Sequence, residues 1–427
     1  MNLDKEFKYG ELIARKRIHL KMTQSEVAEG ICSVPYISKL ENGKLPNENN
    51  HIIELLLLKL SININQHLNE LTDNYQIIKL IYTNINKKNS EVYDYYWSEL
   101  KEKRHRFDQH PLNVDYMLIE LRYYIEKDNL NLANSIFTEI KTYYKTLSTK
   151  QKYYFHYFSG LIFSKQKNVS KGIEHFELAF NIKEESSIED DNLIYYHLAL
   201  AYSITNVPSL SLYYAKEALK ILQDQLDFAN VINCRLIIGI NYVRIKKYIK
   251  AKNHFQQILN ISGTYKDELL ISKVYHNLGY LYSKEGNTES ALQNYKKSLE
   301  YKNENTNLYI NTVYFIIKEY IKVNDITNAT NYINNVINNS YLCNNYESFV
   351  RIQIISYKLH NKDRELENYI QNVATPLFKK NNDTNALAEC YQFIAELYEK
   401  QFKYKKSNRY YKNALNLLNK GGDYDES

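Results

Sequence analysis

The chain has few of the residues that break helices, with only 11 Gly and 5 Pro among 427 residues. A protein of many short strands needs such residues at its turns, so their scarcity disfavours a β fold and favours helices joined by short polar loops. Hydrophobic residues make up 44% of the sequence, which is enough for a folded core. The sequence therefore predicts an all-α protein, and its length predicts two or three domains or one domain plus a repeat array.

Cysteine is also scarce, and the four cysteines, Cys32, Cys234, Cys343 and Cys390, lie far apart with no CxxC pair. This spacing disfavours a zinc site and a disulfide framework, and it is typical of reduced thiols in a core. The N-terminal stretch MNLDKEFKYG has no apolar signal core, and the longest apolar run, residues 52–60, is too short to span a bilayer. We expect a cytoplasmic protein that does not contact a membrane.

Catalytic signatures are missing as well. The sequence contains no GxxxxGK[ST], HExxH or GxSxG motif, and its 11 histidines are scattered without metal-ligand spacing. We therefore expect no enzyme, no cofactor and no metal.

A strong excess of positive charge is absent too. The formal net charge is +6, and residues 1–66 carry nine Lys and Arg against eight Asp and Glu, which leaves +1. Charge alone therefore does not indicate a nucleic-acid-binding protein, so the evidence has to come from the placement of residues.

Two short helices with a tight turn between them are predicted near the N-terminus. Thr23 is a good N-cap, and Glu26 three residues later completes a capping box. Gly30 suits the left-handed end of that helix. Ser33 caps the next helix, and Pro35 lies in its first turn, where its missing N–H costs nothing. The second helix is predicted to end at a left-handed Asn42-Gly43 pair. The pattern predicts a helix-turn-helix.

Several spaced positions together resemble the Xre/Cro-type helix-turn-helix pattern over residues 8–66: Arg17, Thr23-Gln24, Val27-Ala28, Ile37-Ser38 and Glu41-Asn42-Gly43. The resemblance implies that the second helix enters the major groove of DNA. It implies the following DNA-facing residues: Ser33, Val34, Pro35, Tyr36 and Lys39, with Gln24 at a phosphate and Asn42 and Lys44 at the backbone. It also implies an internal Arg17–Glu41 ion pair. Because Pro35 cannot hydrogen-bond a base, specificity would depend on Ser33, Tyr36 and Lys39.

From about Tyr75 onward the sequence repeats with a period near 40 residues. The clearest unit, Tyr275–Glu300, has Gly279, Tyr282, Ala291 and Tyr295 at the small and aromatic positions of a tetratricopeptide repeat. The small residues would let two helices approach closely, and the aromatic ones would fill the gap to the next pair. The same frame recurs around Leu121, Gly160, Ala199, Gly239, Ile317 and Ala395. Such arrays form a right-handed superhelix with a concave groove lined by the first helices.

Polar side chains are expected along that groove. Counted from the motif glycines, the groove-facing candidates are Asn233, Arg244, Lys273, His276, Asn277, Tyr280, Asn311 and Lys318. An Asn side chain offers a donor and an acceptor together, which matches the peptide groups of an extended ligand, and Lys or Arg suits a carboxylate. The alternative interpretation is a merely polar, solvated surface in an Asn-rich chain.

A DNA-reading head joined to a long peptide-binding superhelix resembles the RRNPP family of Gram-positive bacteria, and within it the NprR/PlcR-type regulators. The resemblance implies a helix-turn-helix domain at 1–70, about eight tetratricopeptide-like units at 71–420 and a disordered tail at 421–427. It implies a transcription factor that responds to a short signalling peptide in quorum sensing, with Asn277 gripping the peptide backbone. A homodimer on a palindromic operator in double-stranded DNA follows, because one reading helix covers one half-site.

Two alternatives stay open from the sequence. The repeats could chiefly bind another protein, as in the members of the family that sequester response regulators. The chain could also be a phage-type lysis–lysogeny regulator of similar build, in which peptide binding releases DNA.

Overall fold

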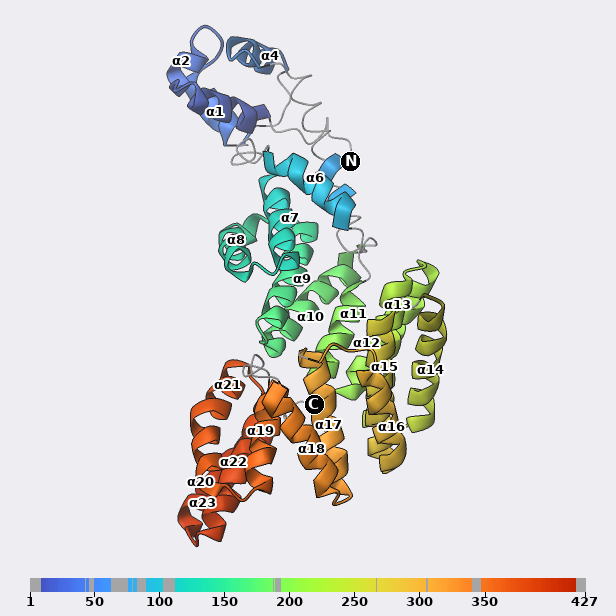
Figure 1. The fold of residues 1–427 in the computed structure, drawn as a ribbon. Coiled ribbons are helices and arrows are strands. Elements are labelled where there is room, and N and C mark those ends of the chain that lie inside the picture. The colour runs from blue at the N-terminus through green and yellow to red at the C-terminus, as the bar shows by residue number, and fades with distance from the viewer. Residues whose placement is uncertain are drawn as a thin grey trace. The chain divides into compact units, whose positions relative to one another are not determined.

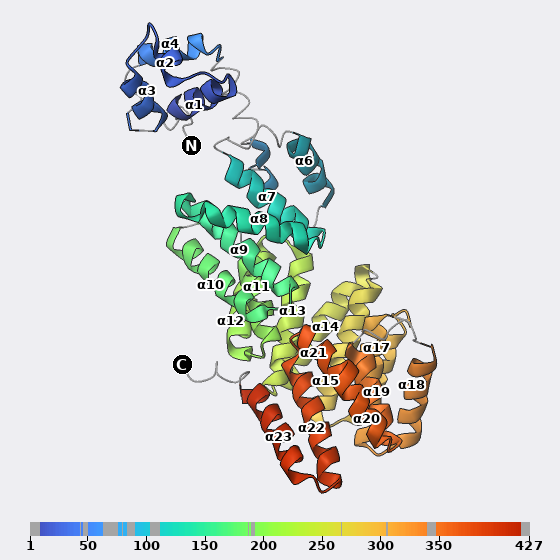
Figure 2. The same ribbon diagram turned by 90° about the vertical axis from the view of Figure 1, so that its left-hand side faces the viewer.

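The computed structural model describes residues 9–42, 44–45, 50–62, 76–78, 80–82, 90–102, 112–186, 188, 193–265, 267–304, 306–339 and 347–419. All regular elements in these ranges are helices (Figures 1 and 2). The chain divides into two compact units, residues 1–151 and 152–427. The predicted all-α class, with a helix-turn-helix followed by tetratricopeptide-like repeats, is confirmed.

Unit 1 holds the predicted helix-turn-helix and the first helix pair of the repeats. Its helices are α1 (Tyr9–His19), α2 (Gln24–Ala28), α3 (Val34–Glu41), α4 (Asn50–Lys59), α6 (Ser90–Glu102), α7 (Asn113–Glu126) and α8 (Leu130–Thr142), with a short 3₁₀ turn at Tyr144–Thr146. The predicted boundary between 1–70 and 71–420 falls within residues 63–75, outside the described ranges, so it stays a prediction. The predicted tail at 421–427 also lies outside them.

Unit 2 is built from successive helix pairs, and its first helix, α9, begins just before the unit does. The pairs are α9 (Thr149–Lys165) with α10 (Val169–Ser186), α11 (Leu193–Ile204) with α12 (Pro208–Asp224), α13 (Phe228–Arg244) with α14 (Tyr248–Tyr265), α15 (Glu268–Glu285) with α16 (Thr288–Leu299), α17 (Asn307–Lys322) with α18 (Ile326–Asn339), α19 (Glu347–Leu359) with α20 (Asp363–Tyr369), and α22 (Thr384–Lys400) with α23 (Tyr404–Asn419). A π-helical segment (Ile370–Ala374) and α21 (Thr375–Lys380) lie between the last two pairs.

A glycine in the first helix of three pairs lets an aromatic ring of the second helix pack on its backbone. A Cβ on Gly279 would lie 2.5 Å from Cδ1 of Tyr295, a residue with no exposed surface. The same clash, at 2.4 Å, would arise between Gly160 and Phe176 and between Gly239 and Phe255. Real Cβ atoms do not approach rings this closely, so these positions require glycine for close packing. The expectation that small residues allow close helix approach is confirmed here.

The turn inside each pair has a residue in the left-handed region, seven positions after the position that holds Gly160, Gly239 or Gly279 in three of the pairs. Gly286, between α15 and α16, has φ +86°. At the turns inside the other pairs the left-handed residue is not a glycine: Asp128, Lys167, Asn206, Lys246, Asn324, Asn361 and Phe402. A lysine or phenylalanine rarely adopts this conformation on its own. The packing of the two helices therefore determines the turn geometry more than the residue type does.

Two structural observations bear on the functional classes considered above. Among the described helices, none combines the length and the low polarity that crossing a membrane requires. Within the same residues, no cluster of three or more His, Cys, Asp or Glu side chains could hold a metal ion. Cys32, Cys234 and Cys390 are free thiols, and burial raises the pKa of Cys234 and of Cys390 to about 12. Cys343 lies outside the described residues.

Candidate DNA-reading head and repeat groove

The helix α3 is anchored in the head by apolar side chains on one of its faces. Ile37 is fully buried and Leu40 nearly so, in a core with Ile13, Val27 and Leu56 from the other three helices. Where α1 crosses α3, the backbones meet: a Cβ on Gly10 would lie 1.9 Å from the carbonyl oxygen of Leu40. The opposite face of α3 is therefore held in a fixed orientation relative to the rest of the head.

The local signals that predicted the helix pair hold in part. Thr23 and Glu26 form the predicted capping box, and Gly30 is left-handed at φ +75°. Pro35 lies in the first turn of α3, as predicted. Ser33 occupies the predicted N-cap position in an extended conformation, but its side chain makes no capping hydrogen bond. One prediction is wrong: Asn42 has φ −86° and is not left-handed, and Gly43 lies outside the described residues.

A three-residue network ties α1, α2 and α3 together. Arg17 donates from Nε and Nη2 to the two carboxylate oxygens of Glu41, at 2.6 and 2.8 Å, which is the internal ion pair that the resemblance implied. Gln24 donates from Nε2 to Oε2 of Glu41 at 2.7 Å. Burial would raise the pKa of Glu41, but the hydrogen bonds from Arg17 and Gln24 outweigh burial and hold that pKa below its ordinary value. The carboxylate therefore stays charged.

This network changes the interpretation of Gln24. The sequence predicted that its side chain contacts a DNA phosphate. In the structure, its amide nitrogen donates a hydrogen bond to Glu41. A glutamine amide has two N–H donors, so a phosphate contact of Gln24 would use the second one, and that contact stays a prediction. A phosphate contact at the start of α2 stays a prediction for the backbone N–H groups there.

The other predicted DNA-facing residues lie on the free side of α3 and just beyond it. Ser33, Val34, Pro35, Lys39, Asn42 and Lys44 are exposed, and Tyr36 is half-buried against the head core. Asn42, at the C-terminal end of α3, donates from Nδ2 to the Ser38 carbonyl oxygen at 2.6 Å. The free side of α3 therefore presents a small surface of both polar and apolar side chains that a DNA groove could receive.

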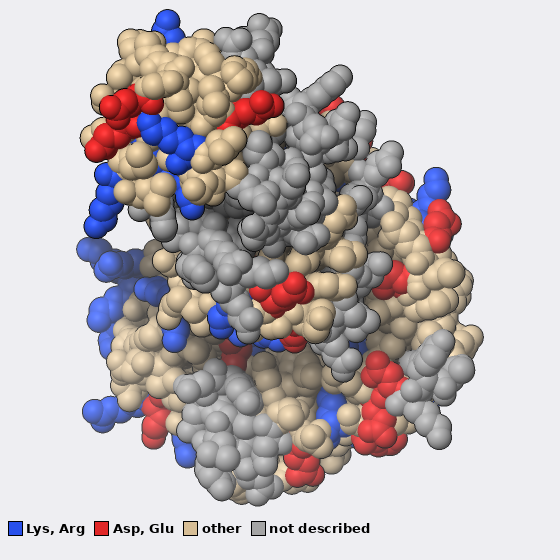
Figure 3. Space-filling view, turned by 90° about the horizontal axis from the view of Figure 1, so that it is seen from above, with Lys and Arg blue, Asp and Glu red and all other residues tan. Residues whose placement is uncertain are grey.

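Charged side chains of both signs occur on the described surface. The face seen in Figure 3 has Lys and Arg side chains as well as Asp and Glu side chains, among a larger area of other residues. This mixture agrees with the small net charge of the chain. Tight DNA binding would therefore depend on the placement of a few side chains more than on a strong overall field.

In the repeats, the first helices of the successive pairs contact one another, and we call their shared surface the inner-helix face. α11 contacts α13, α13 contacts α15, α15 contacts α17, and α17 contacts α19. Hydrogen bonds cross these contacts. Asn241 donates from Nδ2 to Oγ of Ser203 at 3.1 Å, and Ser283 donates from Oγ to buried Glu319. A row of polar groups thus joins neighbouring first helices along this face.

Three of the predicted peptide-contacting residues belong to that row. Arg244 donates from Nη1 to Oγ of Ser203 at 3.1 Å, and Asn311 accepts from Oγ of Ser348 at 3.0 Å. His276 has Nδ1 3.0 Å from Oγ1 of Thr312. Their polar groups are engaged with adjacent helices, so each has a structural contact that the sequence did not indicate. Whether they also contact a peptide stays a prediction.

The other five predicted residues also lie on first helices, but they make fewer contacts with neighbouring helices. Asn233 and Asn277 are half-buried and bond within their own helices: Asn277 donates from Nδ2 to the Lys273 carbonyl oxygen at 2.9 Å, and Asn233 donates to Asn230 at 3.4 Å. The Tyr280 ring lies 6.2 Å from that of Phe315. The side chains of Lys273 and Lys318 are exposed. Among the described residues, the only hydrogen bond of the Asn277 side chain thus uses its Nδ2, and the contact of Asn277 with a peptide stays a prediction.

A pocket of about 530 Å³ lies where α17, α19 and α22 meet, and sequence reasoning missed most of it. Its lining is Tyr314, Lys318, Ile321, Lys322, Arg351, Ile354, Ile355, Lys358, Leu359, Phe378, Ala386, Glu389, Cys390, Gln392 and Phe393. We call it the α17–α19–α22 pocket. Only Lys318 was predicted as a site residue. The degenerate units here have no glycine to mark the frame, so the position of Arg351 on the inner-helix face was not recognisable.

Arg351 sits at the centre of a fixed network in this pocket. It donates from Nη2 to Oδ2 of Asp383 at 2.7 Å and from Nη1 to Oε2 of Glu389 at 3.2 Å. Its guanidinium carbon lies 5.5 Å from the ring centre of Phe378 and 5.8 Å from that of Tyr314. The guanidinium is thus neutralised by two carboxylates and stacked between rings, which holds it in one place.

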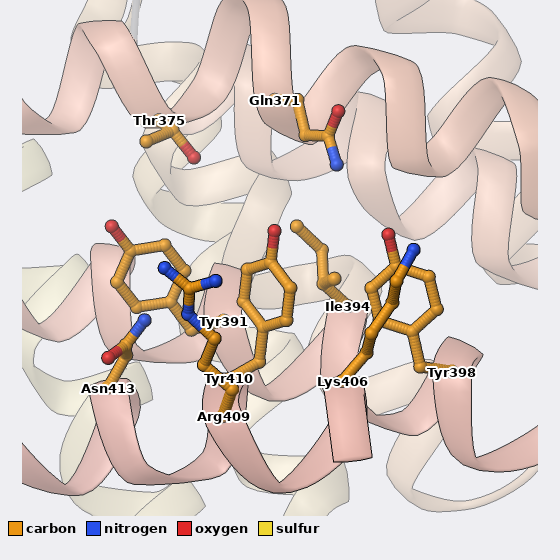
Figure 4. Close-up of a pocket in the computed structure, with 9 residues that line it drawn as sticks. All are labelled: Gln371, Thr375, Tyr391, Ile394, Tyr398, Lys406, Arg409, Tyr410 and Asn413. Carbon is orange, nitrogen blue, oxygen red and sulfur yellow. The ribbon is translucent and has the colours of Figure 1, made fainter. Parts of the chain in front are cut away.

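A second hollow, of about 410 Å³, lies at the last helix pair (Figure 4). Figure 4 shows the hydroxyl groups of Tyr391, Tyr398 and Tyr410 pointing toward the segment that carries Gln371 and Thr375. Tyr398 donates to Oε1 of Glu367 at 2.6 Å. Most of these side chains come from α22 and α23, so the hollow lies between the members of one pair and not between first helices.

Comparison with known proteins agrees with both halves of this architecture. A helix-turn-helix family model matches residues 13–50, and a tetratricopeptide-repeat model matches residues 230–304. The transcriptional activator NprA of Geobacillus stearothermophilus is 26% identical over 405 residues, covering 92% of this chain and 98% of that protein. The regulatory protein RapD of Bacillus subtilis is 30% identical over 244 residues, covering 54% of this chain and 68% of that protein.

Solved structures of the quorum sensor NprR share the fold. The apo form from B. thuringiensis covers 81% of this chain and 99% of its own, with a TM-score of 0.67 at 21% identity. NprR in complex with its cognate peptide NprX also covers 81% of this chain and 98% of its own, with a TM-score of 0.64 at 21% identity. The helix-turn-helix, the repeats and these similarities along most of the chain place it in the RRNPP family, as a helix-turn-helix transcriptional regulator similar to NprA and NprR.

Proposed function

We propose that this regulator reads duplex DNA with α3 and that a short linear peptide, bound on the inner-helix face, controls that binding. Two copies would pair so that two α3 helices meet the two halves of a palindromic operator. Peptide binding would change the pitch of the repeats and thereby the spacing of the two heads, because a ligand shifts a conformational equilibrium toward the state that it binds better.

The exposed side of α3 is the observation that carries the DNA-binding part. Ser33, Pro35 and Lys39 are exposed, whereas Ile37 and Leu40 of the same helix are buried in the head. A helix held in this way by its apolar face can present its free side chains to base edges in the major groove. One such helix covers only a half-site, and the near-neutral head has little affinity to offer alone, which supports a dimer.

The peptide-binding part is supported by the chemistry of the inner-helix face and by the fold shared with NprR, which was solved with its cognate peptide NprX. An extended peptide loses water from its backbone groups when it binds, so the site must replace those hydrogen bonds. Asn277 retains an acceptor for this purpose, since its amide donor bonds within α15. Lys273 and Lys318 add positive charge on the same face.

The DNA-binding part is tested by selecting operator sequences from random duplexes with the full chain. The double variant Tyr36→Ala/Lys39→Ala should then lose roughly 1–3 kcal/mol of binding free energy for each base contact removed. Lys101→Ala, exposed on α6, serves as the matched control. Unchanged operator affinity of the double variant would show that α3 is not the reading helix.

The peptide part is tested by calorimetry with synthetic peptides encoded next to the gene. Asn277→Ala should weaken peptide binding about tenfold, because a peptide group would be left without a partner. Its melting temperature should stay the same, since the described hydrogen bond of Asn277 is within its own helix. Early melting with normal peptide affinity would instead assign Asn277 a structural role.

The same titrations separate the alternatives. A peptide that raises operator affinity indicates activation, and one that lowers it indicates the release expected of a phage-type regulator. If no peptide binds and the repeats retain another protein instead, the protein-partner alternative holds.

A further inference from the structure

We propose that the α17–α19–α22 pocket selects the sequence of the peptide: it receives one bulky apolar side chain, and Lys318 binds a carboxylate of the same ligand. This inference rests on the proposed function, because it names the chemistry of the peptide that the inner-helix face would bind. It also places the residues that select the peptide sequence in the last repeats, and not among Asn233, Asn277 and Asn311 of the central repeats.

The size and the lining of the pocket favour an apolar side chain. Its volume of about 530 Å³ lies within the roughly 300–1,000 Å³ that is usual for ligand sites. Ile321 of α17, Ile355 and Leu359 of α19 and Phe393 of α22 are partly exposed and line it from three helices. Apolar surface that faces solvent in this way gains free energy when a ligand covers it.

Basic side chains outnumber acidic ones in the lining of the pocket. The lining includes Lys318, Lys322, Arg351 and Lys358 and one acid, Glu389. A preference for an acidic ligand group therefore depends on which of these cations has no acidic partner of its own.

Three of these four cations are already paired. Arg351 is held by Asp383 and Glu389, as described above. Lys358 donates to Oε2 of Glu396 at 2.9 Å, with its Nζ 4.4 Å from the ring centre of Phe393. Lys322 donates to the Ser283 carbonyl oxygen at 3.2 Å and lies 3.7 Å from Oε2 of Glu319. These contacts leave little positive charge on these three residues for a ligand.

Lys318 is different. Within the part of the chain that the structure describes, its recorded contact is with the ring of Tyr314, 5.5 Å from Nζ, and it has no acidic partner. It lies one helical turn from Tyr314 and from Ile321 on α17, so its ammonium group and the apolar lining face the same ligand. A carboxylate next to a bulky apolar residue would satisfy both. That carboxylate is either an Asp or Glu side chain or the C-terminus of the peptide.

The test is affinity selection of a mixed library of short random peptides by the full chain, read by mass spectrometry. Half of the library has a free C-terminus and half is amidated. We expect peptides with a bulky apolar residue to be enriched roughly tenfold and those with a neighbouring carboxylate roughly two- to fivefold. Enrichment of Asp or Glu in the amidated half indicates a side-chain carboxylate, whereas recovery restricted to the free half indicates the C-terminal one.

Two variants and one control test the assignment of residues. Lys318→Glu should reverse the charge preference, so that peptides with Lys or Arg replace those with Asp or Glu. Ile355→Trp fills the pocket and should remove the preference for a bulky apolar residue. Lys220→Glu makes the same charge change on exposed α12 and should alter neither preference. Melting curves confirm that all three variants are folded, and Lys318→Glu changes an exposed side chain.

The outcomes separate this inference from the proposed function. If the unmodified protein recovers peptides that show neither preference, or if Lys318→Glu leaves the charge preference as it was, the inference is wrong and the proposed function stands. If it recovers no peptides at all, both this inference and the peptide part of the proposed function are wrong.

Discussion

Lys167 donates from Nζ to Oε1 of Glu347 at 3.1 Å, although 180 residues separate them in the sequence. Asn381 donates to the same oxygen at 2.6 Å, and Asn382 donates to the Lys167 carbonyl oxygen at 3.4 Å. The turn after α9 thus contacts the start of α19 and the turn before α22. Unit 2 therefore closes on itself through a few polar contacts.

This closure should be easy to open. Lys167 and Glu347 are both partly exposed, with side-chain exposures of 53% and 34%, and pairs of this kind contribute about 0–1 kcal/mol. Lys167→Glu should therefore leave the melting temperature nearly unchanged but raise the radius of gyration measured by small-angle scattering. The double variant Lys167→Glu/Glu347→Lys restores attraction and should return the radius to its original value. An equal radius in all three proteins would show that the contact does not hold the unit closed.

A second prediction concerns the glycine–aromatic packing inside the helix pairs. Gly279→Ala places a methyl group 2.5 Å from the Tyr295 ring, which has no room to move because it is fully buried. The overpacking should cost about 1–3 kcal/mol of unfolding free energy. In a variant that also has Tyr295→Leu, Gly279→Ala should cost less unfolding free energy, because the ring that clashes with the added methyl group is absent.

Denaturant unfolding of the two single variants and the double variant measures this coupling. Additive effects of the two changes would contradict the packing described here, since residues in direct contact are expected to couple.

The head was largely predictable from the sequence because its signals are local. The capping box of Thr23 and Glu26, the left-handed Gly30 and the position of Pro35 each depend on residues within one or two turns. Gln24 was assigned differently because its partner, Glu41, is 17 residues away on another helix. Its hydrogen bond depends on how the helices pack, and no short motif encodes it.

The repeat groove was predictable only in part. The small-residue frame placed Arg244, His276 and Asn311 on first helices, yet their hydrogen bonds reach neighbouring repeats, which the period does not reveal. The pocket around Arg351 escaped prediction because α21 and the π-helical segment Ile370–Ala374 interrupt the period there. The contact of Lys167 with Glu347 depends on the accumulated twist of all the intervening pairs.

A third prediction follows from His276, which packs against the rings of Tyr295 and Phe315 and lies beside Thr312, with Lys302 close by. Burial first, and then the charge of Lys302, lower its pKa to about 3. The folded form is therefore neutral where the unfolded form, with an ordinary pKa of 6.5, takes up a proton. Stability from this group is complete above that value and falls as the pH drops from about 6.5 toward 3.

At pH 5 the loss should be on the order of 1–2 kcal/mol. Melting temperatures at pH 7 and pH 5 measure it, and His276→Gln should show a smaller drop between the two than the unmodified protein. His360→Gln, at an exposed position, is the control and should keep the full drop. The same drop in both variants would mean that His276 is not the group that titrates.

The last prediction concerns the Arg17–Glu41–Gln24 network. The two charged side chains are 15% and 7% exposed, so Glu41→Gln would leave the Arg17 guanidinium partly buried without its counter-charge. Losing a hydrogen-bonded charge partner in such a place should cost about 1.5–3 kcal/mol. The loss should be confined to the head, because all three residues join α1, α2 and α3. Hydrogen exchange of the full chain should therefore show faster exchange of the α3 amides, while the helices of unit 2 keep their rates.

The control is Glu54→Gln, exposed on α4, which removes the same charge without a buried partner and should leave the α3 amides protected from exchange. Because Glu41 faces Arg17 and Gln24 and not the free side of α3, operator affinity at low temperature should persist in Glu41→Gln even though the head opens more often. Loss of affinity without faster exchange would instead mean that Glu41 takes part in reading DNA.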